Sequence, residues 1–331
     1  MTRAALATGA IALAVAVLVA GCFGGPSTPH RSDWAFAMVQ VDAMAAQHLT
    51  GAGVAVAVID TGVDLTHPQL SGVTLAFWED LVGGQTTPYD DNGHGTAMVS
   101  ILVGGSPLAG AAPGVSLMVI KAIAADGSGS DATIATAIND AASHGADIIS
   151  LSLGGAAAGL IRVLGSASVN AANAAAAQGV LVVGSAGNDG ESDDGQVAAP
   201  SVAKDAISVG AVDENGNLGG FSSAGKPVLF QGNPDSKPEV VAPGVNIAVA
   251  WLGGQTATVS GTSPAAVFVS GGLALVLESK PTYQRAGASG VDAVKVAIMD
   301  SARPTGGQAQ PHDAHYGYGI FQAQGAAAAL A

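Results

Sequence analysis

Three short motifs contain side chains whose types could support nucleophilic catalysis. Asp60 opens an Asp-Thr-Gly motif, His94 is the centre of Asn-Gly-His-Gly-Thr, and Ser263 lies in Ser-Gly-Thr-Ser-Pro. A serine hydroxyl attacks a carbonyl when a histidine takes its proton, and a carboxylate holds that histidine in the right tautomer. The order Asp, His, Ser along the chain is one of three unrelated orders that build this geometry. The three motifs together predict a catalytic triad, although each one alone is more typical of a turn, a loop or a helix cap.

The elements around these motifs indicate an α/β fold. Short β-branched and apolar runs predict buried strands, whereas the Ala-rich segments between them predict helices. The expected strands are 54–59, 116–123, 147–153, 180–183 and 206–212, and the expected helices include 131–144 and 166–178. Strands that alternate with helices form a mostly parallel central sheet covered on both faces, so we expect a three-layer sandwich. Asp60 would then lie where a strand ends, and catalytic groups gather at such ends.

His94 and Ser263 each precede an apolar segment that is expected to be helical, 97–103 and 265–277 respectively. Pro264 suits the first turn of the second helix. The first amides of a helix have no acceptor within it, so Ser263 would keep a free backbone N–H beside its own hydroxyl. One residue could thus supply both the nucleophile and a donor to the oxyanion that forms on the substrate.

The chain resembles the subtilisin family of serine peptidases from about residue 34 to its C-terminus. The segment 56–64 is similar to the aspartate motif of the family, 93–96 to its histidine motif and 260–263 to its serine motif. Further matches in the family's order are Ala-Ala-Pro-Gly at 111–114, Ser-Leu-Gly-Gly at 152–155, Ala-Gly-Asn-Asp-Gly at 186–190, Val-Ala-Pro-Gly at 241–244 and Tyr-Gly-Tyr-Gly at 316–319. The resemblance implies a subtilisin-like fold and an endopeptidase that acts on proteins or peptides without a cofactor.

The resemblance also implies a role for each site residue. Ser263 would be the nucleophile, His94 the general base and Asp60 the residue that orients the imidazole. Asn188 would donate its side-chain amide to the oxyanion, although a turn residue in Gly-Asn-Asp-Gly is the alternative for its position. The residues that would pair with an extended substrate through backbone hydrogen bonds are Ser152, Leu153 and Gly154.

Departures from the family leave two further readings open. Pro264 stands where the family usually has Met, so the helix start must pack differently, and a catalytically inactive binding or scaffold lipoprotein is an alternative. The Asp-Thr-Gly motif could instead belong to an aspartic protease, but that enzyme needs two such carboxylates and this chain has one motif, so it would require a homodimer. Gln69 replaces an aspartate that binds calcium in many subtilisins, so no metal is expected there.

The N-terminus resembles a bacterial lipoprotein signal peptide. One positive charge at Arg3 precedes an uncharged apolar run, and small residues end that run before Cys22. The expected organisation is a signal peptide at 1–21, a tether at 22–33 that begins with the lipidated Cys22, and the peptidase domain at 34–331. An uncleaved membrane helix is the alternative. Both readings place the domain outside the cytoplasm, and the first anchors it to the cell membrane.

Composition limits the remaining function classes. The 331 residues are 49% hydrophobic and carry a formal charge of −14, which disfavours binding to nucleic acid. The single cysteine cannot form an internal disulfide, and we expect a monomer. Surface positions are expected for His67 and for the pair His312 and His315, and a solvated acidic loop for Glu191, Asp193 and Asp194.

Overall fold

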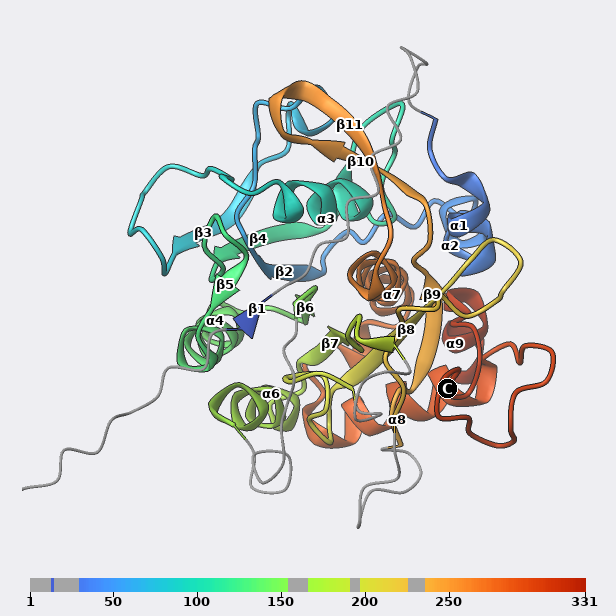
Figure 1. The fold of residues 1–331 in the computed structure, drawn as a ribbon. Coiled ribbons are helices and arrows are strands. Elements are labelled where there is room, and N and C mark those ends of the chain that lie inside the picture. Colours follow the sequence, from blue (N-terminus) through green and yellow to red (C-terminus); the bar gives the residue numbers. More distant parts are fainter. Residues whose placement is uncertain (1–12, 15–29, 154–165, 191–196, 226–235) are drawn as a thin grey trace, which may run out of the picture.

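The computed structural model describes residues 13–14, 30–153, 166–190, 197–225 and 236–331. Among them, seven strands form one sheet in the order β3-β4-β2-β6-β7-β8-β9, with every neighbouring pair parallel (Figure 1). The strands are β2 (Ala55–Asp60), β3 (Leu75–Asp80), β4 (Ser116–Lys121), β6 (Ile148–Leu151), β7 (Leu181–Ser185), β8 (Ile207–Val212) and β9 (Val240–Pro243). The expected α/β fold with a mostly parallel central sheet is therefore confirmed.

Five of these strands lie where apolar runs predict them, and two do not. β2, β6, β7 and β8 are buried along almost their whole length because helices cover both faces of the sheet. β3 lies at the edge of the sheet and is mostly half-buried, so its sequence mixes Phe and Trp with Glu and Asp. β9 has only four residues and ends in Pro243, which is too short a run to stand out as a strand.

One face of the sheet is covered by α4 (Asp131–Ser143) and α6 (Ala167–Ala177). Both helices begin with a serine that caps a free backbone amide, because Ser130 accepts from Thr133 N and Ser166 accepts from Val169 N. Ile134 and Ile138 of α4 pack with small side chains of α6 in the apolar layer against the sheet. This apolar layer packs against the strands and so supports their positions in the sheet.

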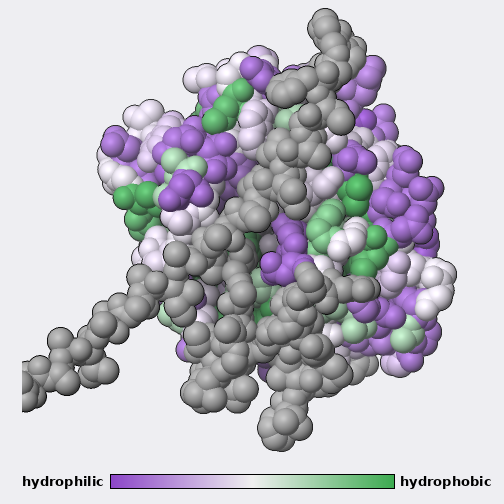
Figure 2. All heavy atoms as spheres, viewed as in Figure 1, coloured by the Kyte–Doolittle hydropathy of each residue, from purple (hydrophilic) through white to green (hydrophobic). Residues whose placement is uncertain are grey.

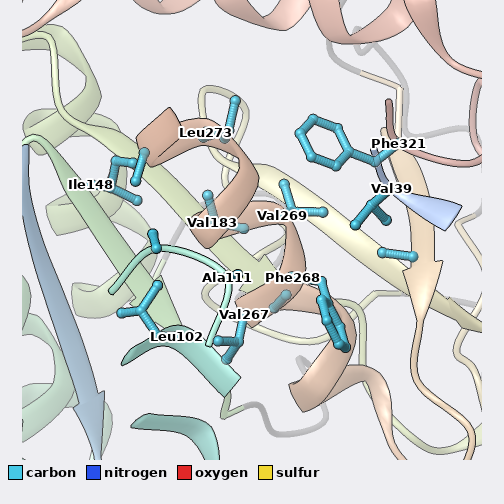
Figure 3. Close-up of a cluster of buried hydrophobic side chains, with 14 of the residues drawn as sticks. Val39, Leu102, Ala111, Ile148, Val183, Val267, Phe268, Val269, Leu273 and Phe321 are labelled. Carbon is cyan, nitrogen blue, oxygen red and sulfur yellow. The ribbon is translucent and has the colours of Figure 1, made fainter. Parts of the chain in front are cut away.

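The other face is covered by α3 (His94–Val103) and α7 (Thr262–Ser279). α7 is long and apolar enough to cross a membrane, but 89% of its 18 residues are buried inside the protein, as expected for a central core helix. Figure 3 shows Val267 of α7 beside Leu102 of α3, and Phe268 on the opposite side from Leu102 and Ile148 within the same buried cluster. The Phe268 ring also meets Phe36 edge to face at a centroid distance of 4.9 Å. The start of α7 is therefore fixed by the core itself.

The remaining elements surround these three layers. They are β1 (Leu13–Ala14), β5 (Ser128–Gly129), β10 (Ile247–Trp251), β11 (Gln255–Val259), α1 (Asp33–Met38), α2 (Val41–Ala45), α8 (Gly287–Ser301), α9 (Ala323–Ala329), and the 3-10 helices η1 (Pro68–Leu70), η3 (Leu252–Gly254) and η4 (Pro281–Tyr283). β10 and β11 form an antiparallel hairpin that packs on α3, and β1 pairs antiparallel with β5. Among the residues coloured by hydropathy in Figure 2, the hydrophobic ones form only small separate patches, and Val82 and Val296 are the exposed large hydrophobic residues of the described chain.

Candidate active site

Asp60 is the last residue of β2, between β4 and β6 in the sheet. The chain turns sharply after it, at Gly62, which has a φ of +115°. A side chain at Gly62 would bring its Cβ to 2.0 Å from the carbonyl oxygen of Tyr89, so only glycine fits there. This close approach brings the segment before α3 next to the carboxylate.

Asp60 and His94 form the central contact of the site. The Nδ1–H of His94 donates to Asp60 Oδ1 at 2.8 Å, and both side chains are buried, at 9% and 2% exposure. The same oxygen accepts the backbone N–H of Thr61 at 2.7 Å. Since a carboxylate only accepts, Nδ1 carries the proton, and neutral His94 has the lone pair of Nε2 available to act as a base.

A second carboxylate, Asp90, holds the start of α3. It accepts the backbone N–H groups of Asn92, Gly93 and Thr96 at 3.0, 2.9 and 2.9 Å, and the Thr96 hydroxyl at 2.6 Å. Burial acts to raise the pKa of Asp90, but these hydrogen bonds outweigh it and lower the pKa below its usual value. Asp90 is therefore ionised at neutral pH, beside the helix terminus that carries His94.

These two carboxylates set the proton affinity of His94. Burial of the ring acts to lower its pKa, whereas the charge and hydrogen bond of Asp60 and the charge of Asp90 act to raise it. The net effect raises the pKa of His94 above its ordinary value, because the opposite charges win over desolvation.

Ser263 lies in the first turn of α7 and is 7% exposed. Its hydroxyl donates to the carbonyl oxygen of Ser152 at 3.0 Å, and the Ser152 hydroxyl donates back to the carbonyl of Ser263 at 3.2 Å. Among the described residues, the Ser263 hydroxyl therefore bonds to the β6 end of the sheet and not to His94. A serine nucleophile has to exchange such a bond for one to its base, and catalytic hydrogen bonds often form only once substrate is bound.

Asn188 lies beside the start of α7 with a fixed orientation. The backbone N–H and the hydroxyl of Thr262 both donate to its Oδ1, at 2.9 and 3.0 Å. A backbone N–H can only donate, so the atom that faces it must be the oxygen, and Nδ2 must point the other way. Thr262 therefore fixes the side chain through Oδ1, and Nδ2, the donor that the resemblance assigns to the oxyanion, is not used in these bonds.

The proposed substrate strand borders a pocket beside the Asp60–His94 pair. The pocket is lined by Asp60, Thr61, Asn92, His94, Ile123, Gly127, Ser152 and Leu153. Ser152 and Leu153 follow β6, and both are buried. Gly154 and Cys22 lie outside the described residues, as does the acidic segment from Glu191 to Asp194.

Comparisons with known proteins agree with this architecture. A model of the subtilase family matches residues 51–319, which include every strand of the central sheet. The chain belongs to the subtilase family. It is 35% identical to subtilisin Savinase of Lederbergia lenta over 254 residues, which are 76% of this chain and 86% of that protein. It is 31% identical to subtilisin E of Bacillus subtilis over 89% of this chain and 71% of the relative, and 35% identical to serine protease AprX of the same species over 71% and 59%.

The expected resemblance is therefore confirmed, and this subtilase is a serine endopeptidase, an enzyme that hydrolyses peptide bonds. The structure adds residues that the motifs did not reveal. Asp90 is one of them, and the signal for it was an aspartate placed just before a helix start, where carboxylates cap free amides. Thr61 is another, because its hydroxyl accepts from Gly95 N at 2.8 Å and donates to Asp90 at 2.9 Å.

The predicted surface position of His67 is wrong, because its side chain is fully buried. Nε2 donates to the carbonyl of Gln255 at 2.6 Å and Nδ1 accepts from Gln69 N at 3.2 Å, so the ring joins η1 to the β10–β11 hairpin. His312 and His315 are half-buried, and the side chain of His315 keeps 38% of its exposure to solvent. No group of three or more metal-ligating side chains occurs in the described residues. The backbone carbonyl of Gln69 accepts from Gly105 N at 2.7 Å.

Proposed function

We propose that this subtilase is an exported, lipid-anchored endopeptidase that cleaves peptide bonds through Asp60, His94 and Ser263. The observation that carries the proposal is the buried 2.8 Å bond from His94 Nδ1 to Asp60, which leaves Nε2 as the base. The support for Ser263 is its position in the first helical turn of α7, against the same strand ends.

The reaction follows from these groups. His94 Nε2 takes the proton of the Ser263 hydroxyl while Oγ bonds to the scissile carbonyl carbon, and the carbonyl oxygen becomes an oxyanion. The Ser263 N–H and Asn188 Nδ2 donate to that oxygen. Collapse of the intermediate breaks the C–N bond, and the leaving amine receives the proton from His94. Water then attacks the acyl-enzyme in the same way and releases the acid.

The proposed substrate strand runs along Ser152, Leu153 and Gly154, with β5 on the opposite side. Support for β5 comes from its antiparallel pairing with β1, in which Leu13 faces Gly129 and Ala14 faces Ser128. The backbone of β5 is therefore able to bind an extended segment, and removal of residues 1–21 would leave it open to substrate. Backbone pairing selects for an extended conformation more than for particular side chains.

The matched test of the triad uses Ser263→Ala, His94→Ala and Asp60→Asn. Each should lower kcat by about 10³-fold or more, because the three residues act as one unit. Peptide p-nitroanilide hydrolysis gives kcat, and thermal melting shows that each variant remains folded. A Ser263→Ala variant that keeps a tenth of the wild-type kcat would show that another group is the nucleophile.

The inactive-scaffold alternative is favoured by one observation, the bond of the Ser263 hydroxyl to Ser152 in place of His94. A fluorophosphonate probe separates the two functions, since it labels a serine only when a base activates it. Labelling of wild type at Ser263, and its loss in His94→Ala, is the expected result. A folded wild-type protein that remains unlabelled would favour the scaffold.

We also propose that the peptidase acts as a monomer that Cys22 anchors to the membrane. The monomer is supported by the lack of a large apolar patch in the described residues. The anchor is tested with Cys22→Ser, which should move the protein from the membrane fraction to the soluble fraction of its host. Light scattering of the residue 34–331 domain should give a mass of one chain.

A further inference from the structure

A buried cation lies behind the candidate active site. Lys121 ends β4, and its side chain has 0% exposure to solvent. A buried ammonium is costly unless it is paired and all its donors are used. It has three N–H donors, and they reach the carbonyl of Thr61 at 2.6 Å, Asp91 Oδ1 at 2.7 Å and the carbonyl of Ile123 at 3.0 Å.

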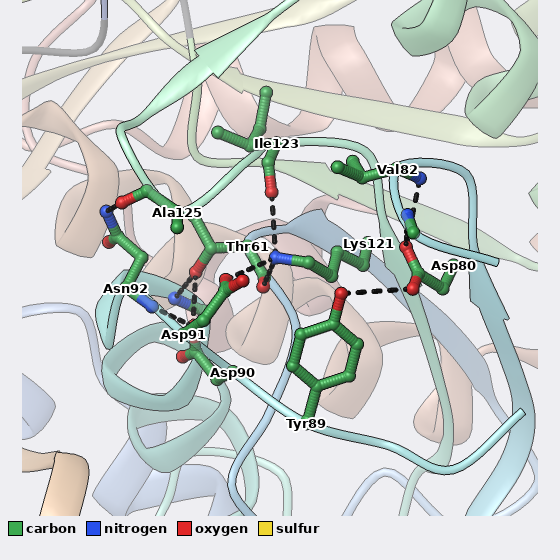
Figure 4. Close-up of polar contacts among 12 residues, drawn as sticks. Thr61, Asp80, Val82, Tyr89, Asp90, Asp91, Asn92, Lys121, Ile123 and Ala125 are labelled. Carbon is green, nitrogen blue, oxygen red and sulfur yellow. Dashed lines mark hydrogen bonds and ion pairs between the residues drawn. The ribbon is translucent and has the colours of Figure 1, made fainter. Parts of the chain in front are cut away.

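The three acceptors belong to different segments that meet at the site (Figure 4). Thr61 directly follows Asp60, Asp91 lies in the segment before His94, and Ile123 lies just after β4. The Tyr89 ring covers the ammonium, with its centroid 5.0 Å from Nζ. Lys121 thus joins the loop that carries Asp60 to the loop that leads into the helix of His94.

Two hydrogen bonds connect Thr61 to Asp60 and to Gly95, the residue after His94. Thr61 donates its N–H to Asp60 Oδ1, the oxygen that also accepts from His94, and its hydroxyl accepts from Gly95 N. A shift of Thr61 therefore moves both partners of the Asp60–His94 bond. A displacement of about 1 Å in such a site can lower the rate by about 10²-fold.

We propose that Lys121 is a positioning residue for peptide hydrolysis: its ammonium fixes Thr61 and Asp91, and through them the alignment of His94 with Asp60. The proposal rests on the proposed roles of these two residues in catalysis. Lys121 does not touch substrate, so its loss should affect kcat and leave substrate binding nearly unchanged.

The chain offers a matched control in Lys237, another buried lysine of the central sheet region. Its side chain is 3% exposed and its ammonium pairs with Glu239 at 2.7 Å. The Glu239 carboxylate also accepts Ser208 N on β8 and pairs with Lys295, so this cluster lies at the β8–β9 edge of the sheet, away from β2 and β4, which carry Asp60 and Lys121. Lys237→Met should cost stability for the same reason as Lys121→Met, without altering the Asp60–His94 pair.

The experiment compares wild type, Lys121→Met, Asp91→Asn and Lys237→Met. Methionine keeps the length and volume of the buried side chain and removes the charge. We expect Lys121→Met to lower kcat by about 10- to 100-fold with KM within about twofold, and Asp91→Asn to lower kcat by about threefold to tenfold. Lys237→Met should lower the melting temperature while kcat per folded molecule stays within about twofold. Each assay is run where circular dichroism shows the variant fully folded.

Two results would overturn the positioning role. One is a folded Lys121→Met whose kcat is within about twofold of wild type, and the other is a Lys237→Met that loses as much kcat as Lys121→Met. If Lys121→Met fails to fold, an unchanged kcat in Asp91→Asn overturns the proposal, because Asp91 is 42% exposed and asparagine there removes the charge of the ion pair without changing the packing of the core. Wild type without peptidase activity, or an active Ser263→Ala, would instead refute the proposed function.

Discussion

Asn188 allows a direct test of the proposed oxyanion site, because separate roles are proposed for its Oδ1 and its Nδ2. Oδ1 accepts from Thr262 N and from the Thr262 hydroxyl, while Nδ2 is the donor proposed for the substrate oxyanion. Asn188→Ala removes both ends. Asn188→Asp keeps an oxygen facing Thr262 and replaces only the donor. The pair of variants therefore separates catalysis from local stability.

The size of each effect follows from these contacts. Removal of the equivalent amide in subtilisin, a relative of this protein, costs about 10²- to 10³-fold in kcat, or about 2.7–4 kcal/mol, so this figure is taken from the relative. Asn188→Ala also leaves the Thr262 N–H without its acceptor, which should cost about 1–3 kcal/mol of unfolding free energy. Asn188→Asp should lose at least as much kcat, because a carboxylate repels the oxyanion, yet lose less stability than alanine.

Steady-state hydrolysis of a peptide p-nitroanilide gives kcat and KM, and urea denaturation gives the unfolding free energy. Both variants should keep KM within about threefold, since the donor acts mainly in the transition state. Thr262→Val keeps Nδ2 but removes one of the two bonds that hold Oδ1, so a loss of about 1 kcal/mol should lower kcat by about fivefold. An Asn188→Asp variant with wild-type kcat would refute the donor role.

Other expected outcomes concern pH, metal and the core. Because Asp60 and Asp90 raise the pKa of His94, kcat/KM should rise with pH through an apparent pKa above 6.5, and a flat profile from about pH 5 to 9 would contradict this. Because the pKa of His94 is raised in the folded state, its protonated form stabilises the fold below the unfolded pKa, and this stabilisation is lost as pH rises through the folded pKa. In urea denaturation, the unfolding free energy of wild type should therefore exceed that of His94→Gln by more at about pH 5 than at about pH 9. EDTA should leave the melting temperature within a degree or two, and a large fall would reveal a metal site. Phe268→Ala should lower the unfolding free energy by about 3–5 kcal/mol in urea, and a loss under 1 kcal/mol would show that the core refills the cavity.

Much of the sheet could be predicted from the sequence because buried parallel strands are locally apolar. The run that forms β2 and the serine before α4 carry their own signals, in β-branched residues and in a side chain that caps the helix. Edge elements carry weaker signals. β3 is half-buried and mixes charged with aromatic residues, and the β10–β11 hairpin depends on packing against α3, which is distant in sequence.

The site shows the same division between local and distant information. Asp60 and His94 lie in recognisable motifs, and the hydrogen bond between them is the contact that the proposed triad requires. The orientation of the Ser263 hydroxyl depends on Ser152, 111 residues away, and no local pattern reports that contact. The predicted surface position of His67 is wrong for a similar reason, since its partner Gln255 is 188 residues away.

Lys121 shows why the residues behind a site are harder to find than those within it. It follows four apolar residues of β4, where a charged residue looks like an ordinary strand end that returns to solvent. In a parallel sheet, however, that end faces the loops of the neighbouring strands, and here those loops cover it completely. Full burial of an ammonium is tolerated only where fixed acceptors surround it, so its partners must themselves be held in place. A charged residue that ends a buried parallel strand beside a catalytic motif is therefore a candidate for positioning that motif, and Asp91 and Thr61 are the partners through which Lys121 would act.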